Sequence, residues 1–406
     1  MATTAVYPPC MAATEALLFR DLAYVFGAAL LGGIVAHAAR QPLILGYVVG
    51  GILVGPFTPG PTVSDVHTFE LLAEIGVILL MFSIGIEFSL RDLLRVKWVA
   101  LVGGPLGIVL SMLLGVGVGW FVGWTVGQGL VVGAVISVAS TMVLARLLID
   151  RGELQSEHGR VMIGITLVED LAVVVLTVLL PSFGSLETSR LLAVGRAMLI
   201  AAVILVPFTY LAFKVVPRVM QRVANTGSED LFLLVALAIA LGTAAVTQAA
   251  GLSLALGAFL GGLIISQSDH AHDALARLLP VRDAFVALFF VTIGTLINPA
   301  AVVGNPQLLT VMVGMIVVGK FLIWMGVVRA FAYPMTTAVL VGVGLTQIGE
   351  FSFILVQVAR NAGLVGDDVY NAALAASLLT ILINAVLVRY VPAWLLARER
   401  AERAAS

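Results

Sequence analysis

The chain has 406 residues, of which 61% are hydrophobic and 11% are charged, and its formal net charge is -1. A soluble domain is roughly 45–50% apolar and about 25% charged, so this composition excludes a soluble globular protein and indicates an integral membrane protein. The only cysteine, Cys10, excludes a disulfide framework and a thiolate metal site. The first residues, up to Thr14, have neither a basic region nor an apolar core, so no signal peptide is expected.

Apolar runs long enough to cross a bilayer, which takes about 20 residues per helix, recur along the chain. In chain order we expect spans at about 18–38, 42–55, 70–90, 98–122, 127–149, 159–182, 191–214, 230–249, 251–267, 281–297, 307–330, 334–358 and 367–390. The second and ninth spans are short and rich in glycine. The sequence therefore predicts an all-α polytopic membrane protein with about 13 transmembrane helices. Residues 1–17 would precede this domain (18–390), and residues 391–406 would form a basic tail.

The distribution of Lys and Arg orients these spans, because cytoplasmic loops carry an excess of both. An odd number of spans places the termini on opposite sides. With a cytoplasmic C-terminus, the 22 Lys and Arg residues fall on the cytoplasmic side except Lys320 and four on the opposite side, Arg20, Arg190, Arg196 and Arg360. We therefore expect a multi-pass protein of the cell (inner) membrane with its N-terminus outside.

The chain also contains an internal repeat. The segment GYVVGGIL at 46–53 resembles GAFLGGLI at 257–264, and MFSIG at 81–85 resembles FVTIG at 290–294. The partners lie seven spans apart, so the two copies face opposite ways across the membrane. Inverted repeats are typical of transporters with a site at the midplane between the copies. The alternative is that these glycines only mark close helix packing.

The repeat pairs about 18–182 with about 230–390, leaves 191–214 as a connector, and matches the fifth span to the twelfth. Both of these spans carry polar residues and glycines at mid-depth: Ser140 and Thr141 in one, Thr346 and Gln347 in the other. Such residues predict interrupted helices, whose free backbone groups must be satisfied by protein or a cavity. We expect Glu350, with Thr346 and Gln347, to compensate charge at the helix ends. Alternatively, the hydroxyls of Ser140 and Thr141 bond back to their own helix.

Two ionisable residues lie in the middle of apolar spans, where a charge costs roughly 2.5–3.5 kcal/mol. Asp170 is 11 residues from the start of its span at Gly159, or about 16 Å, and Lys320 lies at a similar depth in 307–330. This supports an Asp170–Lys320 pair, with a purely structural ion pair as the alternative. Glu169 adjoins Asp170, and whether it titrates is left open. No third ligand accompanies His270 and His272, so no resident metal site is expected there.

Several longer motifs resemble those of a known family. They are GVILLMFSIGIE at 76–87, SVAST at 137–141, GLSLALGAFLGG at 251–262, LFFVTIG at 288–294 and GEFSF at 349–353. Together they are similar to the Kef-type branch of the monovalent cation:proton antiporter-2 family, across roughly residues 20–390. The resemblance implies an inverted-repeat sodium/proton antiporter fold with two crossed broken helices, a dimerisation domain and a mobile core domain. It also implies a homodimer.

In that family a carboxylate on the sixth helix binds cation and proton in turn, which corresponds here to Asp170, and the matching lysine is Lys320. Two departures stand out. Potassium efflux members carry Gln-Asp and many electrogenic sodium/proton members carry Asp-Asp, whereas this chain has Glu169-Asp170. The efflux members also continue into a cytosolic nucleotide-binding domain, whereas this chain ends at Ser406, so ligand gating is not expected.

The resulting hypothesis is secondary antiport of Na+ or K+ against protons by alternating access, with neither an enzymatic activity, a cofactor nor a nucleic-acid partner. The cation would bind ionised Asp170, with oxygens from Ser140, Thr141 and the two helix breaks completing its shell. Three alternatives are a cation channel, a sodium-coupled symporter of an organic anion, and an intramembrane protease. The last would need a buried serine and histidine or two deep aspartates.

Overall fold

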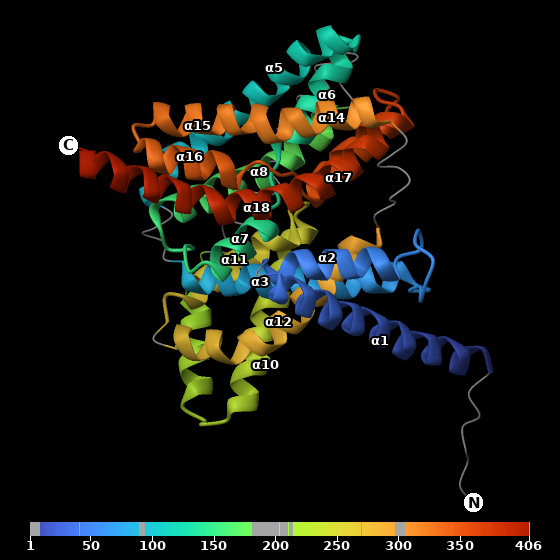
Figure 1. Cartoon of the computed structure of the whole chain (residues 1–406). Helices are drawn as coiled ribbons and strands as arrows, with labels where there is room; N and C mark the ends of the chain where they lie inside the picture. The colour runs from blue at the N-terminus through green and yellow to red at the C-terminus, as the bar shows by residue number, and fades with distance from the viewer. Residues whose placement is uncertain are drawn as a thin grey trace, which may run out of the picture. The chain divides into compact units, whose positions relative to one another are not determined.

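The computed structural model describes residues 9–39, 41–88, 94–180, 203, 210, 214–268, 270–296 and 305–405. Within these ranges the chain forms helices joined by turns, and no residue lies in a strand (Figure 1). The predicted all-α class is confirmed. The structure divides into two compact units, Met1–Val77 with Pro280–Ala300, and Ile78–Leu279 with Ala301–Ser406.

The first unit holds α1 (Pro9–Ala38), α2 (Leu43–Val54), the start of α3 (Val66–Glu87) and the end of α12 (Ala271–Thr295). Helices α1 and α2 pack directly against each other at Gly32 and Gly46, where neither residue has room for a Cβ atom. Small residues allow such close backbone approach in a membrane, where burying apolar surface gives no advantage over lipid.

The second unit contains the longer helices and the predicted interruptions. Its elements are the end of α3, η1 (Val99–Gly103), α5 (Gly104–Val122), α6 (Val126–Ser137), α7 (Thr141–Asp150), α8 (Glu157–Leu179), α10 (Glu229–Ala249), α11 (Leu254–Ile265), the start of α12, α14 (Pro306–Gly314), η3 (Met315–Gly319), α15 (Lys320–Ala330), α16 (Met335–Gly344), α17 (Glu350–Asn361) and α18 (Asp367–Ala405). The segments η1 and η3 are π-helical turns, which occur often at functional sites.

Hydroxyl N-caps begin five of the described helices. The side chains of Thr125, Ser140, Ser156, Ser228 and Ser253 each accept a hydrogen bond from a backbone N–H in the first turn of the following helix. Each cap satisfies one of the N–H groups that a helix start leaves without an intrahelical partner.

Seven of the described helical segments are long and apolar enough to cross a membrane, and α2, α11 and α16 are shorter apolar helices. Every predicted span overlaps a helix or an interrupted helix except 191–214, of which the structure describes only residues 203, 210 and 214. The count of 13 spans and the connector at 191–214 therefore stay predictions. Helix α18 continues to Ala405, so the predicted basic tail is helical up to that residue.

Two glycine contacts match each other under the predicted repeat. In the first unit, a Cβ atom on Gly294 of α12 would lie 2.7 Å from the Cα atom of Gly51 in α2. In the second unit, a Cβ atom on Gly262 of α11 would lie 2.9 Å from the Cα atom of Gly85 in α3. The motifs on which the predicted repeat rests are thus positions where a short helix touches the backbone of its neighbour.

Candidate ion-binding site

The fifth predicted span is interrupted, as the sequence indicates. Helix α6 ends at Ser137 and α7 begins at Thr141, and Val138 and Ser140 between them have extended backbone angles. The whole segment is buried, with the side chains of Ser140 and Thr141 only 6% and 3% exposed. An interrupted helix at this depth is tolerated because protein groups satisfy its freed backbone.

The twelfth predicted span is interrupted as well, between the end of α16 at Gly344 and the start of α17 at Glu350. The two breaks cross at close range, because a Cβ atom on Gly349 would lie 2.6 Å from the Cβ atom of Ser140. At the crossing, Ser140 N donates to Gln347 Oε1 at 2.9 Å, and Gln347 Nε2 donates to Ser140 O at 3.0 Å. The expected pair of crossed, broken helices is confirmed.

Helix α8 brings both members of the acidic dipeptide to the first break. Glu169 and Asp170 are 0% and 2% exposed. Ala139 N donates to Glu169 Oε2 at 2.8 Å, and Thr141 Oγ1 donates to Asp170 Oδ2 at 3.1 Å. Glu169 therefore faces the break, as Asp170 does. The other oxygen of Glu169, Oε1, is buried without a hydrogen-bond partner among the described residues.

Lys320 begins α15 directly after the π-helical turn η3, and its side chain is fully buried. Its Nζ atom donates to the carbonyl oxygen of Gln347 at 3.0 Å, and its charge interacts with that of Glu169. Burying a charge is costly unless it is paired and hydrogen-bonded, and Lys320 has both a carbonyl acceptor and a carboxylate nearby. The direct Asp170–Lys320 pair expected from depth stays a prediction.

These hydrogen bonds form one network through both breaks. Glu169 binds the backbone at Ala139, the adjoining Ser140 exchanges hydrogen bonds with Gln347, and the carbonyl of Gln347 binds Lys320. Lys320 in turn interacts electrostatically with Glu169. A change in the charge of either Glu169 or Lys320 would therefore act on the backbone of both broken helices.

The predicted site residues take different positions in this hydrogen-bond network. Thr141 contacts Asp170 directly, whereas the Ser140 hydroxyl accepts from Val143 N at 3.3 Å and caps α7. The Thr346 hydroxyl donates to Val343 O at 2.7 Å within its own helix end. Glu350 begins α17, but its side chain lies outside the described residues. Compensation of helix-end charge by Glu350 stays a prediction.

Three residues outside the predicted set also hold the breaks. On α18, Ser377 Oγ donates to Ile348 O at 2.9 Å, and Asn384 Nδ2 donates to Val343 O at 2.6 Å and to Thr346 Oγ1 at 3.1 Å. On α17, Ser352 Oγ donates to Val135 O at 2.7 Å. All three are fully or almost fully buried. Their only sequence signal is a polar residue within an apolar span, and Ser377 and Asn384 share one face of α18, seven residues apart.

The site is built from oxygen ligands that suit a hard cation. The carboxylate of Asp170 and the hydroxyl of Thr141 lie within hydrogen-bonding distance of each other, next to a stretch of non-helical backbone. Carboxylate, hydroxyl and carbonyl oxygens bind hard cations, whereas soft metals prefer sulfur. Among the described residues no cluster of His, Cys, Asp and Glu could hold a resident metal ion.

The comparison with known families gives the class of the protein. Residues 26–393 match the family model described as "Sodium/hydrogen exchanger, transmembrane". The chain belongs to the sodium/hydrogen exchanger family. This family consists of membrane transporters that carry ions. The family membership confirms the expectation that the chain is a transporter and not an enzyme, and that it uses transported ions and not a bound cofactor. The resemblance to Kef-type exchangers is confirmed by the relatives.

One relative, YbaL of Escherichia coli strain K12, is named as a cation/proton antiporter and is 37% identical over 382 residues, covering 91% of this chain and 68% of that protein. K(+) efflux antiporter 5 of Arabidopsis thaliana is 34% identical over 379 residues, covering 92% of this chain and 66% of that protein. The chain thus spans about two thirds of the length of these relatives.

Among solved structures, the sodium proton antiporter MjNhaP1 of Methanocaldococcus jannaschii superimposes with a TM-score of 0.68 over 94% of this chain and 99% of that chain, at 17% identity. This likeness shows the fold alone, and the expected sodium/proton antiporter fold of this family of exchangers is confirmed.

Proposed function

We propose that the chain is a secondary active antiporter that exchanges a monovalent cation for protons across the membrane. The observation that carries this proposal is the contact of the Asp170 carboxylate with the Thr141 hydroxyl at the buried crossing of two broken helices. A carboxylate placed there can hold either a cation or a proton, but the two compete for the same oxygens. Competition at one site, opened in turn to each side of the membrane, is sufficient for exchange.

Asp170 is the proposed binding residue, and Thr141 and the carbonyl oxygens of the first break supply the further ligands. Glu169 and Lys320 form a second, adjacent pair of opposite charges that is equally buried. When a cation occupies Asp170, its positive charge repels Lys320 and favours ionised Glu169. Because Lys320 also binds the carbonyl of Gln347, the proposed cycle alters the backbone at the crossing whenever this pair changes its charge.

We propose K+ as the first cation to test. The relatives that are 34–37% identical include K(+) efflux antiporters, whereas the sodium antiporter structure shares only 17% identity. The channel and the organic-anion symporter remain the alternatives, and each predicts a different result: a channel conducts without proton coupling, and a symporter moves protons only with an organic anion.

Everted membrane vesicles containing the protein test this function. Adding K+ or Na+ to respiring vesicles should reverse the imposed pH gradient, and Asp170→Asn should abolish the response because an amide cannot alternate between cation and proton. Asp273→Asn is the matched control, since Asp273 is an exposed aspartate in the first turn of α12. Full activity in Asp170→Asn, with protein levels equal to the unchanged chain, excludes the assignment.

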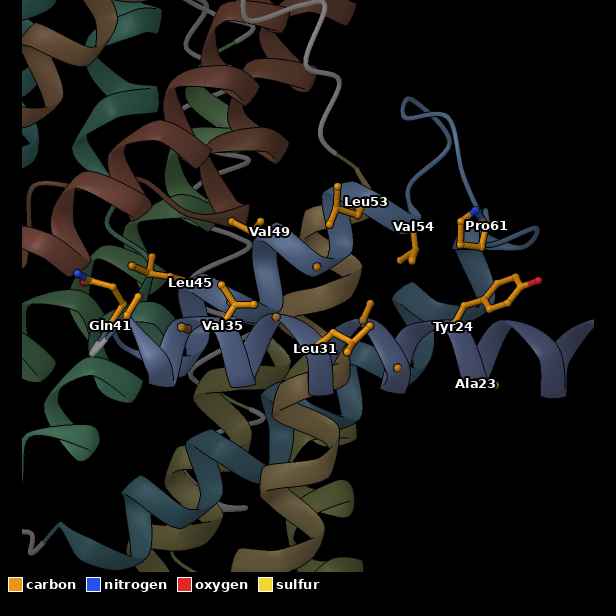
Figure 2. A pocket seen from close by; sticks show the side chains of 17 residues that line it. Ala23, Tyr24, Leu31, Val35, Gln41, Leu45, Val49, Leu53, Val54 and Pro61 are labelled. Atoms are coloured by element: carbon orange, nitrogen blue, oxygen red, sulfur yellow. The ribbon is translucent and has the colours of Figure 1, made fainter.

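We further propose that the protein is a homodimer in the cell membrane and that α1 and α2 form the contact. A groove of about 590 Å³ runs between these two helices and is lined almost wholly by apolar side chains, including Leu31, Val35, Leu45 and Val49 (Figure 2). Val35 is 68% exposed. In a chain with Cys10→Ser, Val35→Cys should form a disulfide-linked dimer on oxidation, whereas Val318→Cys on η3, 57% exposed, should stay monomeric.

The orientation is proposed from the distribution of Lys and Arg, with the N-terminus outside and the C-terminus in the cytoplasm. A membrane-impermeant thiol reagent applied to intact cells should therefore label Cys10 near the N-terminus. It should leave a cysteine introduced at Ser406 unlabelled until the cells are broken. Labelling of Ser406→Cys in intact cells would reverse the assignment.

A further inference from the structure

A second pocket, unrelated to the ion site, opens where several helices of the second unit begin or end. Its volume is about 510 Å³, and it is lined by Arg95, Trp98, Val99, Glu157, Phe331, Ala332, Tyr333 and Pro334. Pockets of about 300–1,000 Å³ suit small molecules or a lipid head group. The combination of one guanidinium, one carboxylate and three aromatic rings distinguishes this pocket from the apolar groove along α1 and α2.

The pocket lies at the level where spans enter and leave the apolar core of a membrane. The apolar segment Val99–Val122 begins beside it, Pro306–Ala330 ends beside it, and the short apolar helix Met335–Gly344 begins on its other side. Glu157 is the first residue of α8. The sequence places all of these ends on the cytoplasmic side, so the pocket lies at the depth of lipid head groups.

The carboxylate of Glu157 is held in a fixed position. Thr337 Oγ1 donates to Glu157 Oε2 at 2.6 Å, which ties the start of α8 to the first turns of α16. Burial, together with the negative charge of Glu157, raises the pKa of the neighbouring Tyr333 above its usual value. Tyr333 therefore keeps its proton at physiological pH and is available as a hydrogen-bond donor beside the carboxylate.

One residue that lines the pocket, Ala332, has an unfavourable backbone conformation. Ala332 has φ of 65°, and it is the only residue other than glycine in the described part of the chain with a positive φ. Such a conformation is unfavourable for a residue other than glycine and persists only where the surroundings determine it. Arg329 fixes this turn by donating from its guanidinium to Tyr333 O at 3.1 Å.

An apolar track leads from the pocket along the surface of η1 and α5. Trp98, Leu101 and Val102, spaced three and four residues apart, are 64%, 59% and 48% exposed, and Val109 and Leu113 continue the row at 51% and 58%. Residues at this spacing lie on one face of a helix. Tryptophan is enriched at the membrane–water interface, so Trp98 marks the boundary between a head group in the pocket and an acyl chain along this row.

We propose that this pocket binds a phospholipid whose head group carries a primary ammonium, as in phosphatidylethanolamine. The ammonium would bind Glu157, the phosphate would bind Arg95, and an acyl chain would follow Trp98, Leu101 and Val102. One lining group of each charge matches a zwitterion, and three N–H donors on a primary ammonium suit the carboxylate better than a quaternary ammonium, which has none. The bound lipid would connect α8, which carries Asp170, to the turn between α15 and α16.

Native mass spectrometry of the purified protein tests the proposal, with phosphatidylethanolamine, phosphatidylcholine and phosphatidylglycerol of identical chains added separately. We expect more bound phosphatidylethanolamine than either of the others. Glu157→Gln should lower that binding by about fivefold, which is the contribution of one exposed charge pair. Trp98→Ala should lower the binding of all three lipids.

Glu229→Gln is the matched control, because Glu229 is also the first residue of a helix behind a serine N-cap, and its partner is Arg277 outside the pocket. It should leave lipid binding unchanged. Size-exclusion profiles identify variants that do not fold, and Thr337→Val, which removes only the hydroxyl that holds Glu157, is a milder second variant. Equal binding of phosphatidylethanolamine and phosphatidylcholine, preference for phosphatidylglycerol, or undiminished binding by a folded Glu157→Gln protein would each overturn the proposal. None of these readouts depends on transport.

Discussion

Gln347 and Ser140 exchange two hydrogen bonds across the point where the two broken helices cross. Each residue lies in the break of its own helix, and the two are 207 positions apart, in opposite copies of the proposed repeat. The amide side chain accepts from the N–H that the interruption frees at Ser140, and it adds a second donor to the Ser140 carbonyl, which also accepts from Leu144 N. The carbonyl of Gln347 meanwhile accepts from Lys320, so one residue connects the first break, the second break and the buried ammonium.

Replacing Gln347 should weaken the contact between the two broken helices and slow exchange. Gln347→Met keeps the length of the side chain but leaves the buried N–H of Ser140 without a partner, at about 1–3 kcal/mol, whereas the Ser140 carbonyl keeps its hydrogen bond from Leu144 N at 3.1 Å. We expect a lower melting temperature and at least a tenfold slower exchange. The control is Gln357→Met, which makes the same change on α17 at a residue that bonds only to Asn361 in the exposed part of the helix. If a Gln347→Met protein of normal stability exchanges ions at the rate of the unchanged protein, the hydrogen bonds between Gln347 and Ser140 do not matter for transport.

No other residue should replace Gly349, because the backbone of the first break leaves no room there for a Cβ atom. A methyl group added there would lie 2.6 Å from Ser140 Cβ and 2.7 Å from Ser140 Cα, so the two breaks would have to separate. Overpacking of this kind costs about 1–3 kcal/mol and displaces the backbone. We expect Gly349→Ala to abolish exchange in vesicles.

Gly326→Ala provides the comparison, since no atom lies within 4 Å of a Cβ atom at that position in α15. It should be neutral or raise stability by up to about 1 kcal/mol, because alanine is the better helix former. If both substitutions have the same effect on exchange, close approach at Gly349 is not the reason.

Lys320 and Glu169 should show strong energetic coupling. Lys320→Met leaves Glu169 buried with its oxygen Oε1 unsatisfied and its compensating charge removed, which costs about 3–5 kcal/mol. Glu169→Gln in the same chain should recover much of this loss, because it removes the uncompensated charge. Thermal unfolding of the two single variants and the double variant measures the coupling. Strictly additive effects would show that the two charges do not stabilise each other.

The same variants report on transport. We expect Lys320→Met to weaken exchange or change its dependence on membrane voltage, which a potassium diffusion potential in proteoliposomes would measure. If neither rate nor voltage dependence changes, Lys320 serves packing only.

Glu153, in the loop between α7 and α8, should contribute stability that depends on pH. Burial opposes its ionisation, but Arg151 at 2.6 Å and His158 at 3.3 Å favour the charged form, and together they lower the pKa of Glu153 below the reference value of 4.5. A lowered pKa in the folded state stabilises the protein above the unfolded value. This contribution is lost as the pH falls through the lowered folded value.

We therefore expect Glu153→Gln to lower stability by about 0.5 kcal/mol near pH 7, because the pair is partly solvent-screened. The difference from the unchanged protein should shrink as the pH falls below about 4.5. Melting temperatures of the two proteins between pH 3 and pH 7 measure this difference. A difference that grows on acidification would contradict the sign of this prediction.

Depth along the chain predicted that Asp170 and Lys320 lie inside their spans, away from the span ends. The positions of Asp170 and Lys320 follow from counting residues from the ends of their spans, and both are buried. Polar residues within the fifth and twelfth spans predicted the two interruptions. The support given by Ser377 and Asn384 was not predicted, since a buried serine or asparagine in an apolar helix can bond to its own turn as readily as to a distant carbonyl.

The sequence by itself determined that the chain is a membrane protein, where most of its helices run, and which residues bear charge within them, because hydrophobicity and helix length are properties of local segments. The tertiary structure decided which groups these residues contact. Glu169 faces the first break beside Asp170, Gln347 bonds to Ser140, and Lys320 binds a carbonyl of the second break. These contacts join segments up to 207 residues apart. They depend on how the helices are rotated and where they cross, and no local sequence pattern encodes either.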